Sequence, residues 1–323
     1  MKKNVKNIFQ LGHFNNTSNI FGILIAFIIM SLVLSIATSS FLRPANLLNV
    51  LQQISINFTL AIGMSFIILL GGIDLSVGSN VALSGLVMAI LMKQMMLPVW
   101  LSIVVGILVA CFIGFLNGFF ITFFSLPPFI ATLGMMSIAR GLAYTITAGQ
   151  PVYTFPPAFT AITGRIWGIP LVTILIMLFL FLIASYVLRY TPYGRSFYAI
   201  GGNRSCANLS GISVKKIEAS AYVLSGFCCG VAATILTSRL DSAVPTNAEG
   251  SELDAIAAVV IGGISMSGGE GSVSGTLIGA LIIGVIANGM NLLYVPQGAQ
   301  RVVKGLIILL AVIIDVLRRR KKD

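Results

Sequence analysis

Residues 189–218 read RYTPYGRSFYAIGGNRSCANLSGISVKKIE and form the one long polar stretch in a chain that is otherwise nearly continuously apolar. Five of these residues are cationic, namely Arg189, Arg195, Arg204, Lys215 and Lys216. Lys and Arg beside apolar spans resist translocation, so a loop that carries them stays on the cytoplasmic side of a membrane. The stretch therefore predicts a cytoplasmic loop between two membrane spans, and it orients the rest of the chain.

Two residues inside this loop predict a short helix. Asn203 is a favourable N-cap, and Gly211 suits the position that follows a helix end. They bracket a predicted helix of about two turns over residues 204–210. Such a helix, carried by rigid spans, offers a surface against which a soluble partner can push. The alternative is a plain solvated connector.

The composition predicts an all-α, polytopic membrane protein. Of the 323 residues, 57% are hydrophobic and 9% are charged, with a mean hydropathy of +1.00, whereas soluble domains carry about 25% charged residues. The net charge of +11 does not point to nucleic acid, because most of the Lys and Arg lie in the loop and near the two ends of the chain. Membrane topology explains the basic character, and we expect no nucleic-acid partner.

Apolar runs predict about ten transmembrane helices in one domain over residues 20–317. The N-terminal segment 1–19 and the basic tail 318–323 are predicted to be cytoplasmic, as is the loop 189–218. Each span needs about 20 apolar residues. The predicted spans are 20–40, 57–72 (after an amphipathic entry at 47–55), 77–92, a fourth ending at 124, 129–147, 168–188, 219–240, 254–264, 271–292 and 298–315.

Glycines at a spacing of four residues predict where helices pack. Small residues at this spacing let helix backbones approach closely in lipid. The glycines are Gly114 and Gly118, Gly226 and Gly230, and Gly271, Gly275 and Gly279. Whether the last three pack within one subunit or across a dimer is open at this point.

Polar residues inside the apolar spans are candidates for lining a translocation path, because an unsatisfied polar group in lipid is costly. The candidates are Asn57, Asp74, Asn80, Asn117, Asn288 and Asn291. The amides have an alternative role as bridges between helices. Asp74 has the alternative of capping the following helix through the amides of Ser76 and Gly78.

Three more charged features lie in or beside spans. Arg140 and Asp254 are candidates for an intramembrane ion pair. Arg301 and Lys304, at the start of the last span, are expected to extend outward toward the interface. A weak internal echo relates LGGIDLS at 70–76 to IGGISMS at 261–267, either as a repeat of the kind that transporters contain or by chance.

Catalytic and nucleotide-binding motifs are missing from the sequence. There is no GxxxxGK[ST], GxSxG or HExxH, the single histidine is His13, and the four cysteines have no metal-ligand spacing. We therefore expect no catalytic residue, no metal site and no cofactor in this chain. The energy for any transport is expected to come from another subunit.

Several motifs resemble the ribose-type sugar permeases, the membrane subunits of binding-protein-dependent ATP-binding-cassette importers. The resemblance rests on GRSFYAIGGNRSCANLSGISVKK at 194–216, LLGGIDLSVGS at 69–79, FIATLGMMSIARG at 129–141 and the run from ELDAIAAVV to NGMNLL at 252–293. It implies an importer-type permease fold whose cytoplasmic loop supplies a coupling helix that docks on the ATPase. The coupling residues it implies are Gly194, Arg195, Gly201, Gly202, Asn203, Arg204, Ala207, Leu209, Ser210 and Gly211.

The resemblance also implies partners. They are a cytoplasmic ABC ATPase that binds ATP and Mg, an extracytoplasmic sugar-binding protein, and a second permease, either an identical copy in a homodimer or a sister chain. The expected location is the bacterial inner membrane, in contact with lipid. The transported monosaccharide is open, and the alternatives to an importer are a self-contained facilitator or secondary carrier and an intramembrane enzyme.

Overall fold

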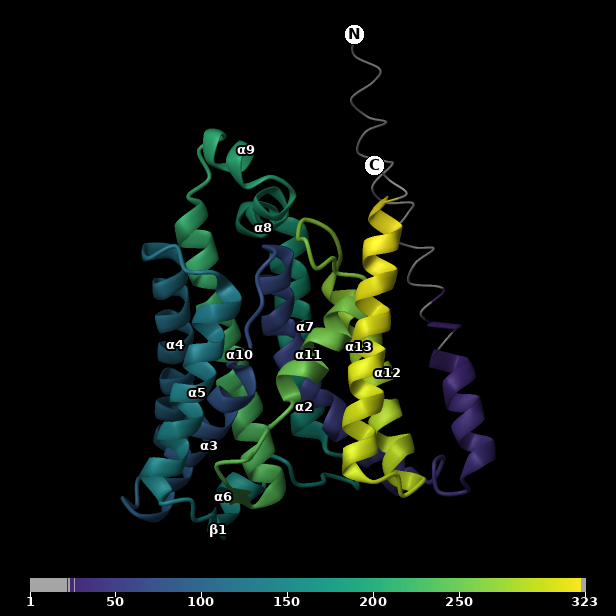
Figure 1. Cartoon of the computed structure of the whole chain (residues 1–323). Coiled ribbons are helices and arrows are strands. Elements are labelled where there is room, and N and C mark those ends of the chain that lie inside the picture. The colour runs from purple at the N-terminus through teal and green to yellow at the C-terminus, as the bar shows by residue number, and fades with distance from the viewer. Residues whose placement is uncertain (1–21, 23, 26, 321–323) are drawn as a thin grey trace.

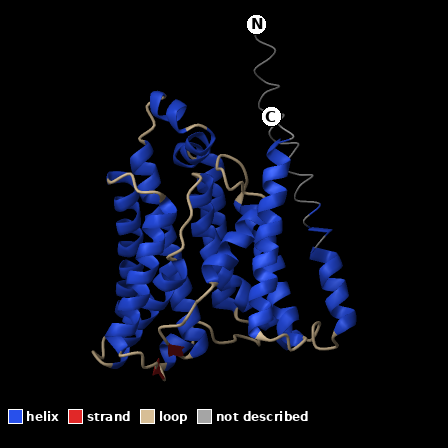
Figure 2. Cartoon of the chain, in the orientation of Figure 1, coloured by secondary structure: helices blue, strands red, loops and turns tan. Residues whose placement is uncertain are grey.

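The structure, a computed structural model, describes residues 22, 24–25 and 27–320, without the side chains of residues 318–320. The predicted N-terminal segment 1–19 and the last residues of the basic tail lie outside this part. The chain forms a bundle of helices between two faces (Figure 1), one with α8 (Pro192–Gly202) and α9 (Arg204–Leu209), the other with α6 (Pro157–Thr160) and β1 (Val152–Tyr153). Strands are nearly absent from the described residues (Figure 2), where β1 pairs antiparallel with β2 (Ser242–Ala243).

Six helices in the described part of the chain are long and apolar enough to cross a membrane, as a multi-pass membrane protein requires. The other long elements are a helix at Phe27–Ala37, α3 (Val77–Lys93), α11 (Ser251–Ile261) and the charge-bearing α13 (Gln297–Arg320). A count of about ten spans is therefore not confirmed. The six are α2 (Pro44–Leu69), α4 (Val99–Phe123), α5 (Pro128–Thr147), α7 (Leu171–Tyr190), α10 (Val214–Leu240) and α12 (Val273–Leu292).

Helix α2 lies at the centre of the bundle and is buried over most of its length. The predicted entry at 47–55 and the predicted span at 57–72 belong to one helix of 26 residues, which ends at Leu69. Polar residues near the junction of the two are satisfied within the helix. The hydroxyls of Ser55 and Thr59 donate to carbonyls four residues earlier, at 2.8 and 2.7 Å.

The spaced glycines lie where helices are in contact. Gly114 and Gly118 of α4 face α10, and a Cβ added to Gly118 would lie 2.9 Å from the Cα of Ala219. From the other side, Gly226 and Gly230 face α4 in the same way. Any larger side chain would push these two backbones apart.

The glycines of the other series lie within the single chain. Gly275 and Gly279 of α12 face the end of α11, where added Cβ atoms would meet the backbone of Gly262 and Ala258. Gly271 precedes α12, with a φ of 124° and Ile264 beside it. The contact in this chain is thus between α11 and α12.

Two short helices, α3 and α11, begin next to each other inside the bundle. A Cβ on Gly78, in the first turn of α3, would collide with the carbonyl of Ala248 and the carboxylate of Glu252. Non-helical segments, residues 70–76 and 244–250, lead into these starts. Irregular backbone at membrane depth is tolerated where it is buried in protein or lines a water-filled cavity. The meeting point of α3 and α11 is such a place.

Candidate functional site

The polar loop 189–218 folds into two helices rather than the single one that the sequence predicts. Helix α8 starts with Pro192 in its first turn, and the hydroxyl of Thr191 accepts a hydrogen bond from the amide of Gly194 at 3.0 Å. Proline in the first turn after a threonine cap is a recognised helix start. The Thr-Pro pair was therefore the signal that the sequence interpretation missed.

Helix α9 begins and ends as its capping residues predict. The side chain of Asn203 accepts a hydrogen bond from the amide of Cys206 at 2.9 Å. At the other end Gly211 has a φ of 82°, its amide donates to Asn208, and the amide of Ile212 donates to Ala207 at 3.1 Å. This is the paired hydrogen-bond pattern of a Schellman motif, so both ends of α9 are fixed by local interactions.

The two helices form a platform, here called the α8–α9 platform, that presents some coupling candidates to solvent and buries others. Leu209 is 87% exposed at the end of α9, an unusual position for a large apolar side chain. Ala207 is buried against Ile200 and Val214. Ala207 thus fixes α9 to its neighbours, whereas Leu209 is free to meet a partner. The further exposed coupling candidates are Arg195, Gly202, Asn203, Arg204, Ser210 and Gly211.

The platform rests directly on the ends of the membrane helices. Gly201 lies so close to the carbonyl of Leu69, at the end of α2, and to the backbone of Gly268 and Gly269 that a Cβ would overlap them. The amide of Gly269 also donates to Leu69 at 2.9 Å. The two segments of the sequence echo therefore meet beneath Gly201. At the start of α8, Gly194 packs equally closely on the backbone of Val187 and Leu188.

An ion pair ties α9 to the first turns of α10. Both terminal nitrogens of Arg204 contact the carboxylate of Glu218, with Nη1 3.0 Å from Oε1. Glu218 is buried, and the hydrogen bonds that it accepts raise the pKa of Arg204 above its usual range. Beside the pair is a cavity of about 450 Å³, lined also by Lys215, the end of α2 and the turn between α4 and α5. The pair therefore joins α9 to α10 by a two-pronged contact.

Asp74, a path candidate, lies in a buried network at the start of α3. One of its carboxylate oxygens accepts from the amide of Ser76 at 2.9 Å and from the Ser76 hydroxyl at 2.6 Å. The other accepts from Ser225 of α10 at 3.3 Å, and Asn117 donates to the Ser76 hydroxyl at 2.8 Å. The contact with the Ser76 amide is one of the two that the capping alternative requires, whereas the amide of Gly78 makes no hydrogen bond to this carboxylate. The path role of Asp74 stays a prediction.

Besides Asn117, which contacts Ser76, three of the asparagine candidates make contacts between segments. Asn80 donates to the carbonyl of Ala110 at 3.1 Å, and Asn288 exchanges two hydrogen bonds with Asn46. Asn291 accepts from Gln300 at 2.9 Å. Asn57 and Asn117 are buried between helices. The single chain thus favours the helix-bridging alternative for Asn80 and Asn288, and a path role for any of these residues stays a prediction.

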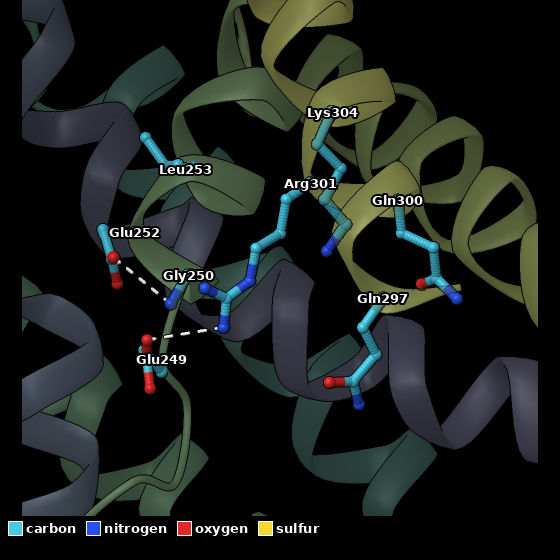
Figure 3. Close-up of a pocket in the computed structure, with 8 residues that line it drawn as sticks. All are labelled: Glu249, Gly250, Glu252, Leu253, Gln297, Gln300, Arg301 and Lys304. Carbon is cyan, nitrogen blue, oxygen red and sulfur yellow. Dashed lines mark hydrogen bonds and ion pairs between the residues drawn. The ribbon is translucent and has the colours of Figure 1, made fainter. Parts of the chain in front are cut away.

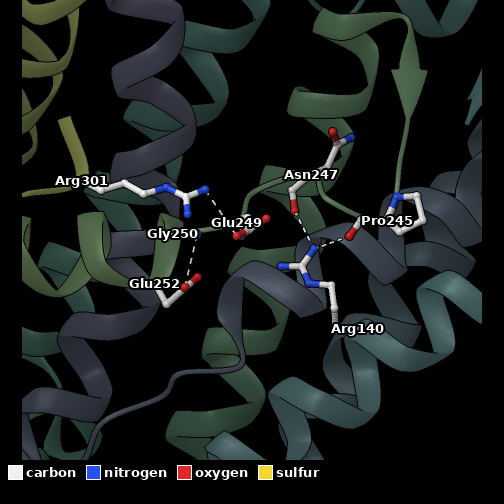
Figure 4. A network of polar contacts seen from close by, with 7 residues as sticks. All are labelled: Arg140, Pro245, Asn247, Glu249, Gly250, Glu252 and Arg301. Atoms are coloured by element: carbon white, nitrogen blue, oxygen red, sulfur yellow. Dashed lines mark hydrogen bonds and ion pairs between the residues drawn. The ribbon is translucent and has the colours of Figure 1, made fainter. Parts of the chain in front are cut away.

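The candidate ion pair between Arg140 and Asp254 is wrong. Arg140 donates to the carbonyls of Pro245 and Asn247 in the segment before α11 (Figure 4). Asp254 instead binds Lys304 of α13, with 2.8 Å between Nζ and Oδ2. Arg140 is therefore held by backbone carbonyls, and Asp254 has a different cationic partner.

The same region contains charged residues that the sequence interpretation did not connect. Glu249 and Glu252 lie around the start of α11, and Arg301 of α13 has Nη2 3.5 Å from Oε1 of Glu249. The two glutamates were not among the predicted site residues, and Arg301 was expected to extend outward. No sequence signal relates residues 249 and 301, because only the fold brings α11 and α13 together. Within the described residues no group of His, Cys, Asp and Glu is arranged to hold a metal ion.

Comparison with known proteins gives one family. The model of a family described as "Branched-chain amino acid transport system / permease component" matches residues 46–312. The ribose import permease protein RbsC of Bacillus subtilis (strain 168) is 48% identical over 314 residues, covering 96% of each chain. RbsC of Haemophilus influenzae is 44% identical over the whole of both chains.

Relatives named for other substrates are also similar. The D-allose transport system permease protein AlsC of Escherichia coli (strain K12) is 38% identical over 291 residues, covering 90% of this chain and 89% of AlsC. No solved structure matches the chain. The similarity to these relatives extends over nearly the whole sequence, including the polar loop 189–218 with α8 and α9.

Proposed function

The chain belongs to the branched-chain amino acid transport system / permease component family, and from this premise we propose that it is the membrane subunit of an ATP-driven, binding-protein-dependent importer of a ribose-like monosaccharide. In this role it forms the translocation path and has no catalytic residue of its own. ATP and Mg are bound by a cytoplasmic ABC ATPase, and a sugar-binding protein delivers the monosaccharide from outside. The chain itself needs no cofactor.

The observation that carries the proposal is the construction of the α8–α9 platform. It exposes an apolar residue, Leu209, at the tip of a helix capped at both ends. It is also fixed to α2 through Gly201 and to α10 through the ion pair of Arg204 and Glu218. A partner that binds at the tip and moves is therefore mechanically connected to two helices of the bundle core. A loop that only connects two spans needs neither an exposed apolar tip nor a rigid attachment to α2 and α10.

The choice of a monosaccharide rests on the relatives. The names of RbsC from two organisms specify ribose, and AlsC specifies D-allose, whereas the family description mentions branched-chain amino acids. The higher identity to the two ribose permeases supports a pentose as the first substrate to test. A polar but uncharged cargo is also compatible with candidate path residues that are mostly amides.

The partners and location follow the same proposal. Two copies of the chain enclose one path in the bacterial inner membrane, with lipid around them and the α8–α9 platform in the cytoplasm. Both termini then lie on the cytoplasmic side, in agreement with the positions of the Lys and Arg residues. The candidate path residues Asn57, Asp74, Asn80, Asn117, Asn288 and Asn291 belong to this proposal.

The test is uptake of labelled D-ribose, D-allose and L-leucine into vesicles that contain the chain with or without its ATPase and binding protein. We expect ATP-dependent uptake of a monosaccharide only when both partners are present. Uptake by the chain alone would replace the proposal with a facilitator or secondary carrier. Uptake of leucine but of neither sugar would overturn the substrate class while leaving the importer.

A further inference from the structure

Charged side chains lie inside the thickness of the bundle, around the start of α11. This helix has 11 residues, which span about 16 Å at 1.5 Å per residue, whereas the hydrocarbon core of a bilayer is about 30 Å thick. Figure 1 shows α11 starting near mid-height and running toward the face that carries α8 and α9. Glu249 and Glu252, at its start, are therefore at membrane depth.

Two of these charges are open to the surroundings in the single chain. The side chain of Arg301 is 75% exposed and that of Glu249 is 56% exposed. Charged side chains at membrane depth face the interior of a bundle or a water-filled cavity and not lipid. The side of α11 and α13 that carries Glu249 and Arg301 therefore faces the water of the proposed path or the second copy of the chain, and not lipid.

A pocket of about 410 Å³ opens at this place (Figure 3). Its charged residues include two acids and two bases, so the lining has no net charge. The pocket lies between the start of α11 and the first two turns of α13. Its lining residues are Glu249, Gly250, Glu252, Leu253, Gln297, Gln300, Arg301 and Lys304.

The two ion pairs beside the pocket differ in strength. Lys304 and Asp254 are 2.8 Å apart, with side chains that are 27% and 12% exposed. Arg301 and Glu249 are 3.5 Å apart and largely exposed, and exposed pairs of this kind contribute little stability. The pair of Lys304 and Asp254 holds α13 against α11. The pair of Arg301 and Glu249 can open to bind a ligand with little loss of stability.

We propose that this pocket is a monosaccharide subsite on the translocation path, in which Glu249 accepts and Arg301 donates hydrogen bonds to sugar hydroxyls. The inference rests on the importer function proposed above and names the residues that contact its cargo. A neutral polyol fits a lining of balanced charge that contains many donors and acceptors. The pocket is also of the size that proteins use for small ligands, and the weak pair of Glu249 and Arg301 re-forms when the sugar leaves.

The first test is uptake of D-ribose by the complete complex with Glu249→Gln or Arg301→Gln. We expect each variant to lose about tenfold or more in uptake, which corresponds to 1.4 kcal/mol, while copurifying with its partners in wild-type amounts. Arg165→Gln is the matched control, because Arg165 is an exposed arginine that contacts Asn49 away from the pocket. It should transport at the wild-type rate. Unchanged uptake in the two pocket variants overturns the subsite.

A second test does not depend on transport or on the charged pair. Cysteine is introduced by Gln297→Cys in the pocket or by Tyr294→Cys, an exposed position outside it, and cells are treated with a membrane-impermeant thiol reagent. Near the concentration that half-fills the site, D-ribose should slow labelling at position 297 by about twofold and leave position 294 unaffected. The unsubstituted chain, whose only exposed cysteine is Cys206 within its described part, gives the background.

The outcomes separate this inference from the function on which it rests. If the unsubstituted complex imports no monosaccharide, the proposed function fails. If it imports ribose, but ribose slows labelling equally at positions 297 and 294 or at neither position, the subsite fails and the importer stands. Protection confined to position 297 supports the subsite even where Glu249→Gln or Arg301→Gln prevents assembly.

Discussion

Arg204 and Glu218 form a two-pronged ion pair between α9 and α10, with Nη1 of Arg204 3.0 Å from Oε1 of Glu218. The carboxylate is buried, whereas the side chain of Arg204 is 57% exposed. The pair therefore has one end in the helix bundle and the other at the surface to which we propose that the ATPase binds. It connects the α8–α9 platform to a core helix, as does the hydrogen bond of 2.5 Å between the hydroxyls of Tyr193 in α8 and Ser220 in α10.

Replacing either member of this pair should weaken the connection. Glu218→Gln leaves Arg204 with a single neutral acceptor, and a hydrogen bond to a charged group is worth about 1.5–3 kcal/mol when buried, less here because Arg204 is exposed. We expect ATP-dependent uptake to fall several-fold with both Glu218→Gln and Arg204→Gln. The double variant should be no worse than Glu218→Gln alone. Additive losses would show that the two residues act independently.

Leu209→Glu should abolish ATP-driven uptake without unfolding the chain. Leu209 is 87% exposed, so a charge there meets water in the free subunit and disturbs only a partner that buries the position. Copurification of the ATPase with the membrane subunit measures the loss directly. Leu209→Met is the matched control and should retain binding. Full uptake by Leu209→Glu would remove α9 from the coupling contact.

Ala207 is not an equivalent probe, although the sequence interpretation grouped it with Leu209. Its side chain is buried against Ile200 and Val214, so a bulky charge there would displace α9 itself. This difference illustrates what the sequence can and cannot provide. The ends of α9 were predictable because capping is local and depends on Asn203 and Gly211. The side of the helix that faces inward depends on contacts with α8 and α10.

Two adjacent glycines in α8 should respond differently to alanine. A Cβ at Gly201 would overlap the backbone of Leu69 and Gly269, whereas a Cβ at Gly202 has nothing within 4 Å. Backbone atoms cannot move aside as the end of a flexible side chain can. Gly201→Ala should therefore lower the free energy of unfolding by about 1–3 kcal/mol through overpacking. The measurement is the midpoint of thermal unfolding, and uptake is expected to fall with it. Gly202→Ala should unfold at the wild-type midpoint. Equal behaviour of the two would contradict the close packing of α8 on α2.

The membrane helices were predictable to different degrees. The start and end of α3 agree with the predicted span 77–92, because glycine and charge mark its ends. The predicted entry at 47–55 and span at 57–72 proved to be one helix, in which polar side chains such as Ser55 bond to the backbone of their own helix. The pocket at Glu249 and Arg301 was not predictable, because these residues are 52 positions apart and meet only where α11 starts inside the bundle.

Asp74→Asn tests whether the buried carboxylate caps α3 or contacts the cargo. The oxygen of an asparagine side chain can still accept from the Ser76 amide, as the carboxylate does at 2.9 Å, so the capping contact survives. We therefore expect Asp74→Asn to assemble and to transport within about twofold of wild type, whereas Asp74→Ala should cost about 1–2 kcal/mol of stability through the loss of the cap. Thermal unfolding of the purified complex and uptake of D-ribose measure the two effects. An Asp74→Asn variant that assembles fully but does not transport would favour the path role, because the contact with Ser76 is kept while the charge and the acceptor for Ser225 are lost.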